Sequence, residues 1–170
     1  MSKVKKVLES NPNLCNHFRK HRTVFIDGYG NASFIQKIEG IKGLSLIELH
    51  DTRTLHKFPD TEEIYFLIET DQPWFFPVIF SSNHSVAFTD KGISIVADGK
   101  YKFNKFLPWT VIKEVHLEND QFVFATDDED IKIDNQWIYR IENKENYRAD
   151  AEIIAKIMHL IAAQHQGTDD

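Results

Sequence analysis

The side chains best suited to acid–base chemistry lie in one short polar segment. His50, Asp51 and His56 occur within seven residues, and a histidine beside a carboxylate can serve as a general base whose ring the carboxylate orients. Such a pair needs a nucleophile or a metal ion from elsewhere in the fold, and a pocket where these side chains converge. A small enzyme that uses these three residues is therefore one alternative for the function.

A thiol and two more histidines occur near the N-terminus. His17 and His21 lie four residues apart, on one face of an expected helix, with Cys15 close by. A zinc ion needs three or four ligands at about 2.0–2.3 Å, and no fourth ligand can be identified here. The acidic run 127–130 lacks the ligand spacing and the glycine of a calcium loop. We interpret the two histidines as surface residues, and the acidic run as a solvated hairpin tip or a docking spot for a basic partner. The sequence predicts no metal and no cofactor.

Charge is distributed unevenly along the chain, which has a net charge of −6. Residues 1–22 hold six basic residues and one acidic residue, a net charge of +5, which leaves −11 for residues 23–170. Overall acidity argues against nucleic-acid binding and against stable association with an anionic membrane. The basic segment either packs on the acidic body and shields it, or meets an acidic surface of a partner.

The length and composition suit one domain with its own core: 170 residues, of which 42% are hydrophobic. No apolar run reaches the ~20 residues of a transmembrane helix, and no apolar signal core follows the basic N-terminus. Cys15 is the only cysteine, so a reducing compartment is the simplest assumption. These features predict a cytoplasmic protein.

Residues 1–60 are expected to form an α-rich extension. Apolar residues at helical spacing predict a helix over 1–22, and Pro12 predicts a kink or a split into two short helices. Thr23–Ile26 is a short β-type run. The segment 50–56 fits either a strand end or a loop.

Residues 61–170 show short strands separated by turn residues, a pattern typical of an antiparallel sheet that closes into a barrel or sandwich. The turn Asp90–Gly92 joins two of them, with Gly92 expected in the left-handed conformation. An amphipathic helix is expected over 146–166, stopped by Gly167. Strands are expected at 64–68, 74–80, 84–89, 93–96, 101–107, 111–117, 121–125 and 131–133.

Two motifs in this region are distinctive: VAFTDKGISI at 86–95 and LPWTVIKEV at 107–115. They resemble the bacterial pleckstrin-homology-like (PH-like) domains, in which a hydrophobic–Thr–x–x–Gly–Ile strand pair precedes a Pro–Trp–x–x–Ile segment. The matching residues are Thr89, Gly92, Ile93, Trp109, Ile112 and Val115. Over roughly residues 62–165, the resemblance implies an α+β fold: an antiparallel PH-like β-barrel or roll capped by a C-terminal helix, here preceded by the extension.

The most apolar stretch is WFFPVIF at 74–80. Pro77 within it favours an edge strand or a bulge. The aromatic side chains either belong to the core or leave an apolar patch at a sheet edge for a protein partner. The residues of this patch are Trp74, Phe75, Phe76 and Phe80.

Three lysines form the one basic concentration of the acidic half: Lys100, Lys102 and Lys105. In eukaryotic relatives of the PH fold such lysines meet phosphoinositides. However, residues 62–134 contain 14 acidic residues against 6 lysines and no arginine, which disfavours an anionic membrane. The lysines either keep an edge strand soluble or take part in binding.

Together these patterns predict a non-catalytic PH-like binding or adaptor module for protein–protein interaction in the bacterial cytoplasm. It would act through a sheet edge, the barrel mouth or the basic N-terminal helix, and the four aromatic residues and three lysines above are its candidate binding residues. A second alternative is an acidic inhibitor or immunity-type protein that masks a basic surface, with an affinity that falls steeply with salt. The sequence indicates neither the partner's identity nor the oligomeric state.

Overall fold

The computed structural model describes residues 2–16, 24–26, 52–69, 84–97, 103–135, 138 and 147–167. Residues 52–56 form a helical turn, where the sequence indicated a strand end or a loop. The other elements are α1 (Lys3–Ser10), α2 (Pro12–Asn16), β1 (Val24–Ile26), β2 (Phe66–Glu69), β3 (His84–Phe88), β4 (Gly92–Ala97), β5 (Phe103–Pro108), η3 (Trp109–Val111), β6 (Glu114–Glu118), β7 (Gln121–Ala125), β8 (Ile131–Asp134) and α5 (Tyr147–Gln166).

The strands form two antiparallel sheets, one of five strands in the order β1-β2-β3-β4-β5 and one of three in the order β6-β7-β8. The α+β class, the antiparallel pairing and the C-terminal helix are therefore as predicted. Of the predicted alternatives, a barrel, a roll or a sandwich, the described part of the chain does not form a closed barrel, because β5 and β6 belong to different sheets. The helical turn η3 lies between them, and a helical backbone cannot continue a strand ladder.

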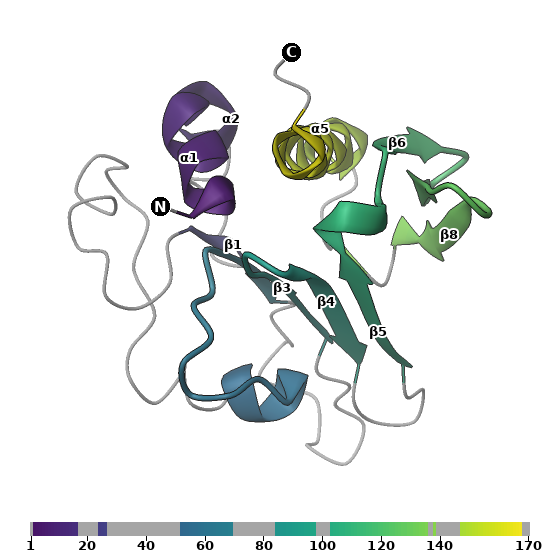
Figure 1. Cartoon of the computed structure of the whole chain (residues 1–170). Helices are drawn as coiled ribbons and strands as arrows, with labels where there is room; N and C mark the ends of the chain where they lie inside the picture. Colours follow the sequence, from purple (N-terminus) through teal and green to yellow (C-terminus); the bar gives the residue numbers. More distant parts are fainter. Residues whose placement is uncertain are drawn as a thin grey trace.

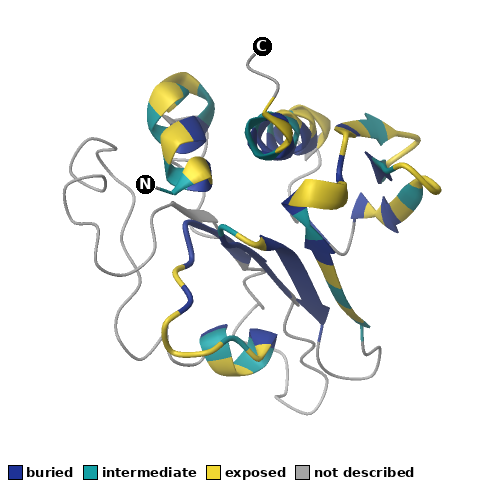
Figure 2. Cartoon of the chain, viewed as in Figure 1, coloured by how far each residue is buried: buried dark blue, intermediate teal, exposed yellow. Residues whose placement is uncertain are grey.

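The main core lies between the five-stranded sheet and the helices. α1 and α5 cover one face of this sheet, and the helical turn 52–56 lies on the opposite side (Figure 1). β4 is buried along its whole length (Figure 2), which explains an apolar sequence there with little alternation. The largest side chains of the main core are Trp109, Phe66, Phe88, Phe122 and Phe124.

Trp109 attaches η3 to the turn between β3 and β4. Its ring is fully buried, and its Nε1–H donates to the carbonyl oxygen of Thr89 at 2.7 Å. Its backbone N–H donates to the carbonyl oxygen of Lys91 at 3.2 Å. The ring meets Phe88 edge-on, with centroids 5.4 Å apart. The indole thus has the hydrogen-bond partner that its burial requires.

The N-terminal segment splits before Pro12, as predicted, and packs on the body of the protein. Ser2 caps α1: its Oγ accepts from the N–H of Lys5 at 3.0 Å and donates to Asp90 Oδ1 at 2.5 Å. No ion pair joins the lysines of α1 to an acidic side chain of the sheets among the described residues. The helix is held by the hydrogen bonds to Asp90 at its start and by apolar contacts of Val4, Val7 and Leu8.

Gly92 has a different role from the predicted one. Its φ is not positive, whereas Gly167 ends α5 with a φ of 76°, as predicted. A Cβ atom on Gly92 would lie 2.3 Å from the carbonyl oxygen of Leu107 and 2.8 Å from Cζ of Phe106. Glycine is therefore required here by the close approach of β5, not by backbone conformation.

We expect Gly92→Ala to lower the free energy of unfolding by about 2 kcal/mol or more, because a backbone oxygen must move to admit the methyl group. Gly167→Ala is the matched control. It meets no atom within 4 Å and should cost about 1 kcal/mol from its positive φ alone. Urea unfolding of both variants gives the comparison, and equal losses would contradict the packing explanation.

We also expect Cys15 to resist thiol reagents in the native protein. The side chain is fully buried in α2, and its burial raises the pKa of the thiol to about 12. Reaction with a disulfide reagent such as DTNB should be at least about 100-fold slower than in urea. A native rate close to that of the unfolded chain would contradict this placement.

Candidate functional site

The structure places one of the seven predicted binding residues. Lys105 lies in the middle of β5, which is the last strand of its sheet among the described residues. The other predicted residues lie outside the described part of the chain: Trp74, Phe75, Phe76, Phe80, Lys100 and Lys102, together with His50 and Asp51 of the alternative enzyme site.

The outer edge of β5 carries backbone groups that have no hydrogen-bond partner among the described residues. An antiparallel ladder uses the N–H and C=O of every second residue. The backbone N–H of Trp109 donates to the carbonyl oxygen of Lys91, and the β4–β5 register continues from this pair. The backbone groups of residues 103, 105 and 107 therefore form the hydrogen bonds to β4. The N–H and C=O of Asn104 and Phe106 therefore point outward. They form no hydrogen bond within the described structure.

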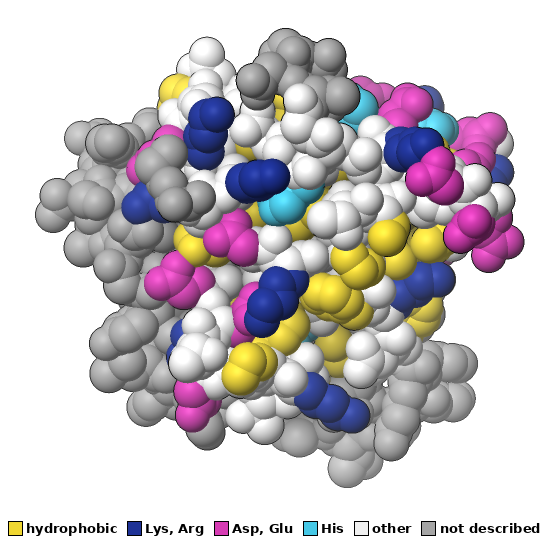
Figure 3. Space-filling model, in the orientation of Figure 1, with side chains coloured by type: hydrophobic (Ala, Val, Ile, Leu, Met, Phe, Trp, Pro, Cys, Tyr) yellow, Lys and Arg dark blue, Asp and Glu magenta, His cyan; other side chains and the backbone are white. Residues whose placement is uncertain are grey.

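Beside this edge lies a hollow of about 240 Å³. Phe106 lies opposite Ser94 of β4, on the face of the sheet turned away from the main core, and is 44% exposed. Hydrophobic side chains gather over β5 and η3, with basic and acidic side chains beside them (Figure 3). The hollow is lined by His56, Lys57, Phe58, Pro59, Glu62, Thr89, Lys91, Ser94, Asn104 and Phe106.

His56 forms the buried floor of this hollow. Its side chain projects from the helical turn 52–56 onto the sheet, and its residue is only 6% exposed. Nδ1 lies 2.7 Å from Ser94 Oγ and Nε2 lies 2.8 Å from Ser85 Oγ. The ring of Phe58 stacks on the imidazole at a centroid distance of 5.3 Å. A neutral imidazole has one donor and one acceptor, and the two hydroxyls satisfy both.

These contacts make His56 a poor general base. Burial lowers its pKa to about 4, so the ring is neutral at pH 7 with little tendency to take a proton. Both serines are also buried, at 2% exposure each. The arrangement holds the helical turn against β3 and β4.

A second group of polar contacts fixes the rim of the hollow. Both Nε and Nη2 of Arg53 donate to the backbone oxygen of Glu62, at 3.0 and 2.7 Å. The buried carboxylate of Glu62 pairs with the exposed ammonium of Lys91. Lys57, on the same rim, has a φ of 57° and forms no ion pair with any described residue.

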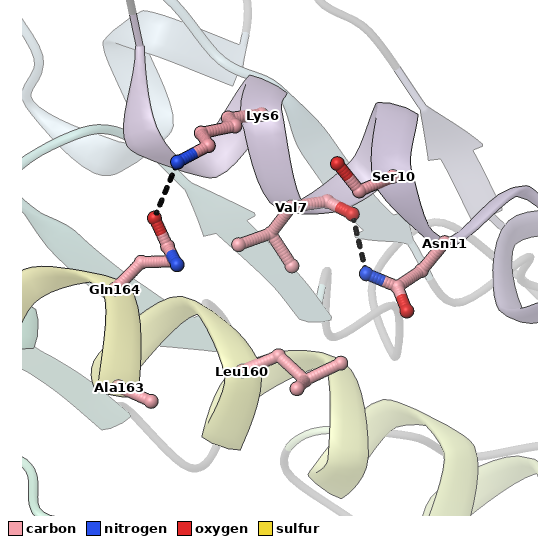
Figure 4. A pocket seen from close by; sticks show the side chains of 7 residues that line it. All are labelled: Lys6, Val7, Ser10, Asn11, Leu160, Ala163 and Gln164. Atoms are coloured by element: carbon pink, nitrogen blue, oxygen red, sulfur yellow. Dashed lines mark hydrogen bonds between the residues drawn. The ribbon is translucent and has the colours of Figure 1, made fainter. Parts of the chain in front are cut away.

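Two other hollows have fewer features of a binding site. One lies between α1 and α5 (Figure 4), where Lys6 Nζ donates to Gln164 Oε1 at 3.4 Å at one end, and Ser10 and Asn11 lie at the other. Lys6 is its only charged side chain, and no acid–base pair forms there among the lining residues. Its walls are the packed faces of two helices.

The other hollow, of about 300 Å³, lies between β6 and α5. β6 is also an edge strand, but α5 covers it: Val115 N–H points outward and meets His159 Nδ1 at 3.4 Å. On its rim, Glu114 Oε1 and His116 Nδ1 lie 3.6 Å apart. The edge of β5 is the more open of the two.

The described residues do not form a metal site, since no three histidine, cysteine, aspartate or glutamate side chains come together among them. None of the described helices has the length and apolar character needed to cross a bilayer. The chain matches no protein-family model, no curated protein and no solved structure. The resemblance to PH-like domains therefore stays a prediction.

Sequence reasoning missed the hollow because its parts are far apart in the chain. Ser85 and Ser94 are polar residues within otherwise apolar strands, which was the one available signal. Buried hydroxyls in such positions require a partner. Nothing in the sequence identified His56 as that partner, because the helical turn that carries it was not predicted.

We expect His56 to make the protein less stable in acid. The unfolded state takes up a proton near pH 6.5, whereas the folded state does so only near pH 4, so stability is lost as the pH falls between these values. The loss approaches about 3 kcal/mol at the lower end. Urea unfolding at pH 7 and 4.5 should show that His56→Gln loses about 2 kcal/mol less than the wild type. The same loss in both proteins would contradict the assignment.

Proposed function

We propose that this protein is a non-catalytic binding module of the bacterial cytoplasm that takes an extended segment of a protein partner at the outer edge of β5. The single observation that carries the proposal is the pair of outward-facing backbone positions, Asn104 and Phe106, beside an exposed aromatic ring. An extended peptide can add a strand to such an edge through backbone hydrogen bonds, while pockets beside it select side chains.

The arrangement of elements supports a PH-like scaffold for this module. α5 packs against η3 and β6, at the place where the two sheets meet. A capping helix in that place is what the resemblance implies. The edge strand belongs to the larger sheet and lies away from this helix.

The engagement of His56 supports binding over catalysis at this face. Both of its ring nitrogens are occupied by buried serines, and the residue stiffens the floor of the hollow. A general base needs a free nitrogen within reach of a substrate proton.

The acidic inhibitor remains a second candidate, favoured by the small sheet. Residues 113–135 contain eight acidic residues and two lysines, a net charge of −6. Acidic side chains gather at this end of the molecule (Figure 3), and the turn residues 127–130 are all exposed. A basic partner bound here would dissociate as salt rises, whereas binding at β5 would depend on backbone hydrogen bonds.

Peptide selection tests the site. Random octapeptides displayed on phage are selected against the full chain, and the recovered peptides are measured by fluorescence anisotropy. Asn104→Pro should weaken their binding at least tenfold, because it removes an outward N–H from the edge without breaking the ladder to β4.

Lys132→Pro in β8 is the matched control. It removes the equivalent outward N–H from an edge of the small sheet and should leave binding unchanged. Circular dichroism checks that both variants fold. Full binding by Asn104→Pro, or loss only in Lys132→Pro, would overturn the proposal.

A further inference from the structure

We propose that the hollow beside β5 is a side-chain pocket that receives one large apolar residue, preferably aromatic, from an acidic extended peptide. This inference rests on the proposed function, because it assumes that the peptide lies along β5. It adds the chemistry that the partner must have. The juxtaposition that carries it is a strand edge with outward-facing backbone groups, a hollow flanked by two aromatic rings, and two lysines on the rim of that hollow.

The register of the sheet directs alternate side chains of an added strand into this hollow. Ser94, Phe106 and Asn104 lie on the face of the sheet turned away from the main core, and all three line the hollow. Side chains in a strand added to β5 alternate between the two faces. Every second residue of the peptide therefore lies on the side of the hollow.

The size and lining of the hollow suit a single side chain. Its volume of about 240 Å³ is below the usual range for a small-molecule site, roughly 300–1,000 Å³. Phe58 and Phe106 supply aromatic surface and Pro59 supplies aliphatic surface. Aromatic rings favour aromatic partners in offset or edge-on contact.

The pocket is formed before a ligand arrives. His56 is held by two buried serines, its ring supports Phe58, and the rim is held by two hydrogen bonds from Arg53 to Glu62. A preformed pocket loses little conformational freedom when it is filled. This is the structural role that the polar network on this face performs.

The charge around the edge selects an acidic peptide. Two lysines, Lys57 and Lys91, lie on the rim, and the one carboxylate among the lining residues, that of Glu62, is already paired with Lys91. A second copy of this chain is a poor occupant. Two β5 strands paired about their centres would place the two Lys105 side chains together, and like charges directly opposite are destabilising.

The test uses the peptides recovered by display on the full chain. Their sequences should contain one Phe, Trp, Tyr or Leu with Asp or Glu nearby. Replacing the large apolar residue by Ala should weaken binding at least tenfold. Replacing an acidic residue of the peptide by its amide should weaken binding to the wild-type protein about threefold. The same replacement should weaken binding to the Lys57→Ala variant by less.

Asn104→Phe provides an independent test on the protein side. Its new ring fills the hollow while its backbone N–H still points outward, so affinity for the anchored peptides should fall at least tenfold. The Ala-substituted peptides should bind this variant as they bind the wild type. Lys132→Phe, at an exposed position of β8, is the matched control and should have no effect.

The outcomes separate the two proposals. Two results would overturn the pocket and leave the edge proposal standing. In both, the peptides lose binding to Asn104→Pro. In the first they tolerate Ala at every position, and in the second they bind Asn104→Phe as they bind the wild type. Failure to recover peptides that need β5 would overturn both. A dimer in sedimentation that Asn104→Pro dissociates would place a second copy at the edge and overturn the acidic-peptide inference.

Discussion

The burial of Trp109 against the turn between β3 and β4 is the constraint on which the rest of the structure depends. Its indole N–H donates to the carbonyl oxygen of Thr89. The next residue of that turn, Asp90, forms hydrogen bonds with α1 and α5. Asp90 accepts from Ser2 at the start of α1 through its side chain, and from His165 near the end of α5 through its backbone. One short turn thus joins η3, α1 and α5 to the five-stranded sheet.

The two faces of the five-stranded sheet are stabilised by different kinds of contact. The face toward α1 and α5 is filled by apolar side chains, which supply most of the hydrophobic stabilisation. The opposite face carries Ser85 and Ser94, and the buried His56 joins them. Because every member of this buried network has a hydrogen-bond partner, it fixes the floor of the hollow beside β5 with defined geometry.

The close approach of β4 and β5 at Gly92 links packing to the proposed site. The missing side chain gives room to the ring of Phe106, which can then lie over the sheet while remaining partly exposed. Lys105 lies in the same strand, and lysine is a residue that commonly protects strand edges from pairing with another chain.

The sequence by itself determined the elements whose signals are local: the split of the first helix at Pro12, the hairpin strands, the amphipathic α5 and its stop at Gly167. It also indicated an edge strand with lysine. Tertiary structure alone decided that the sheets stay separate in the described chain, that Gly92 serves a close contact, and that His56 meets two serines. These depend on contacts between residues distant in the sequence, and periodicity records only which residues are buried, not what they bury against.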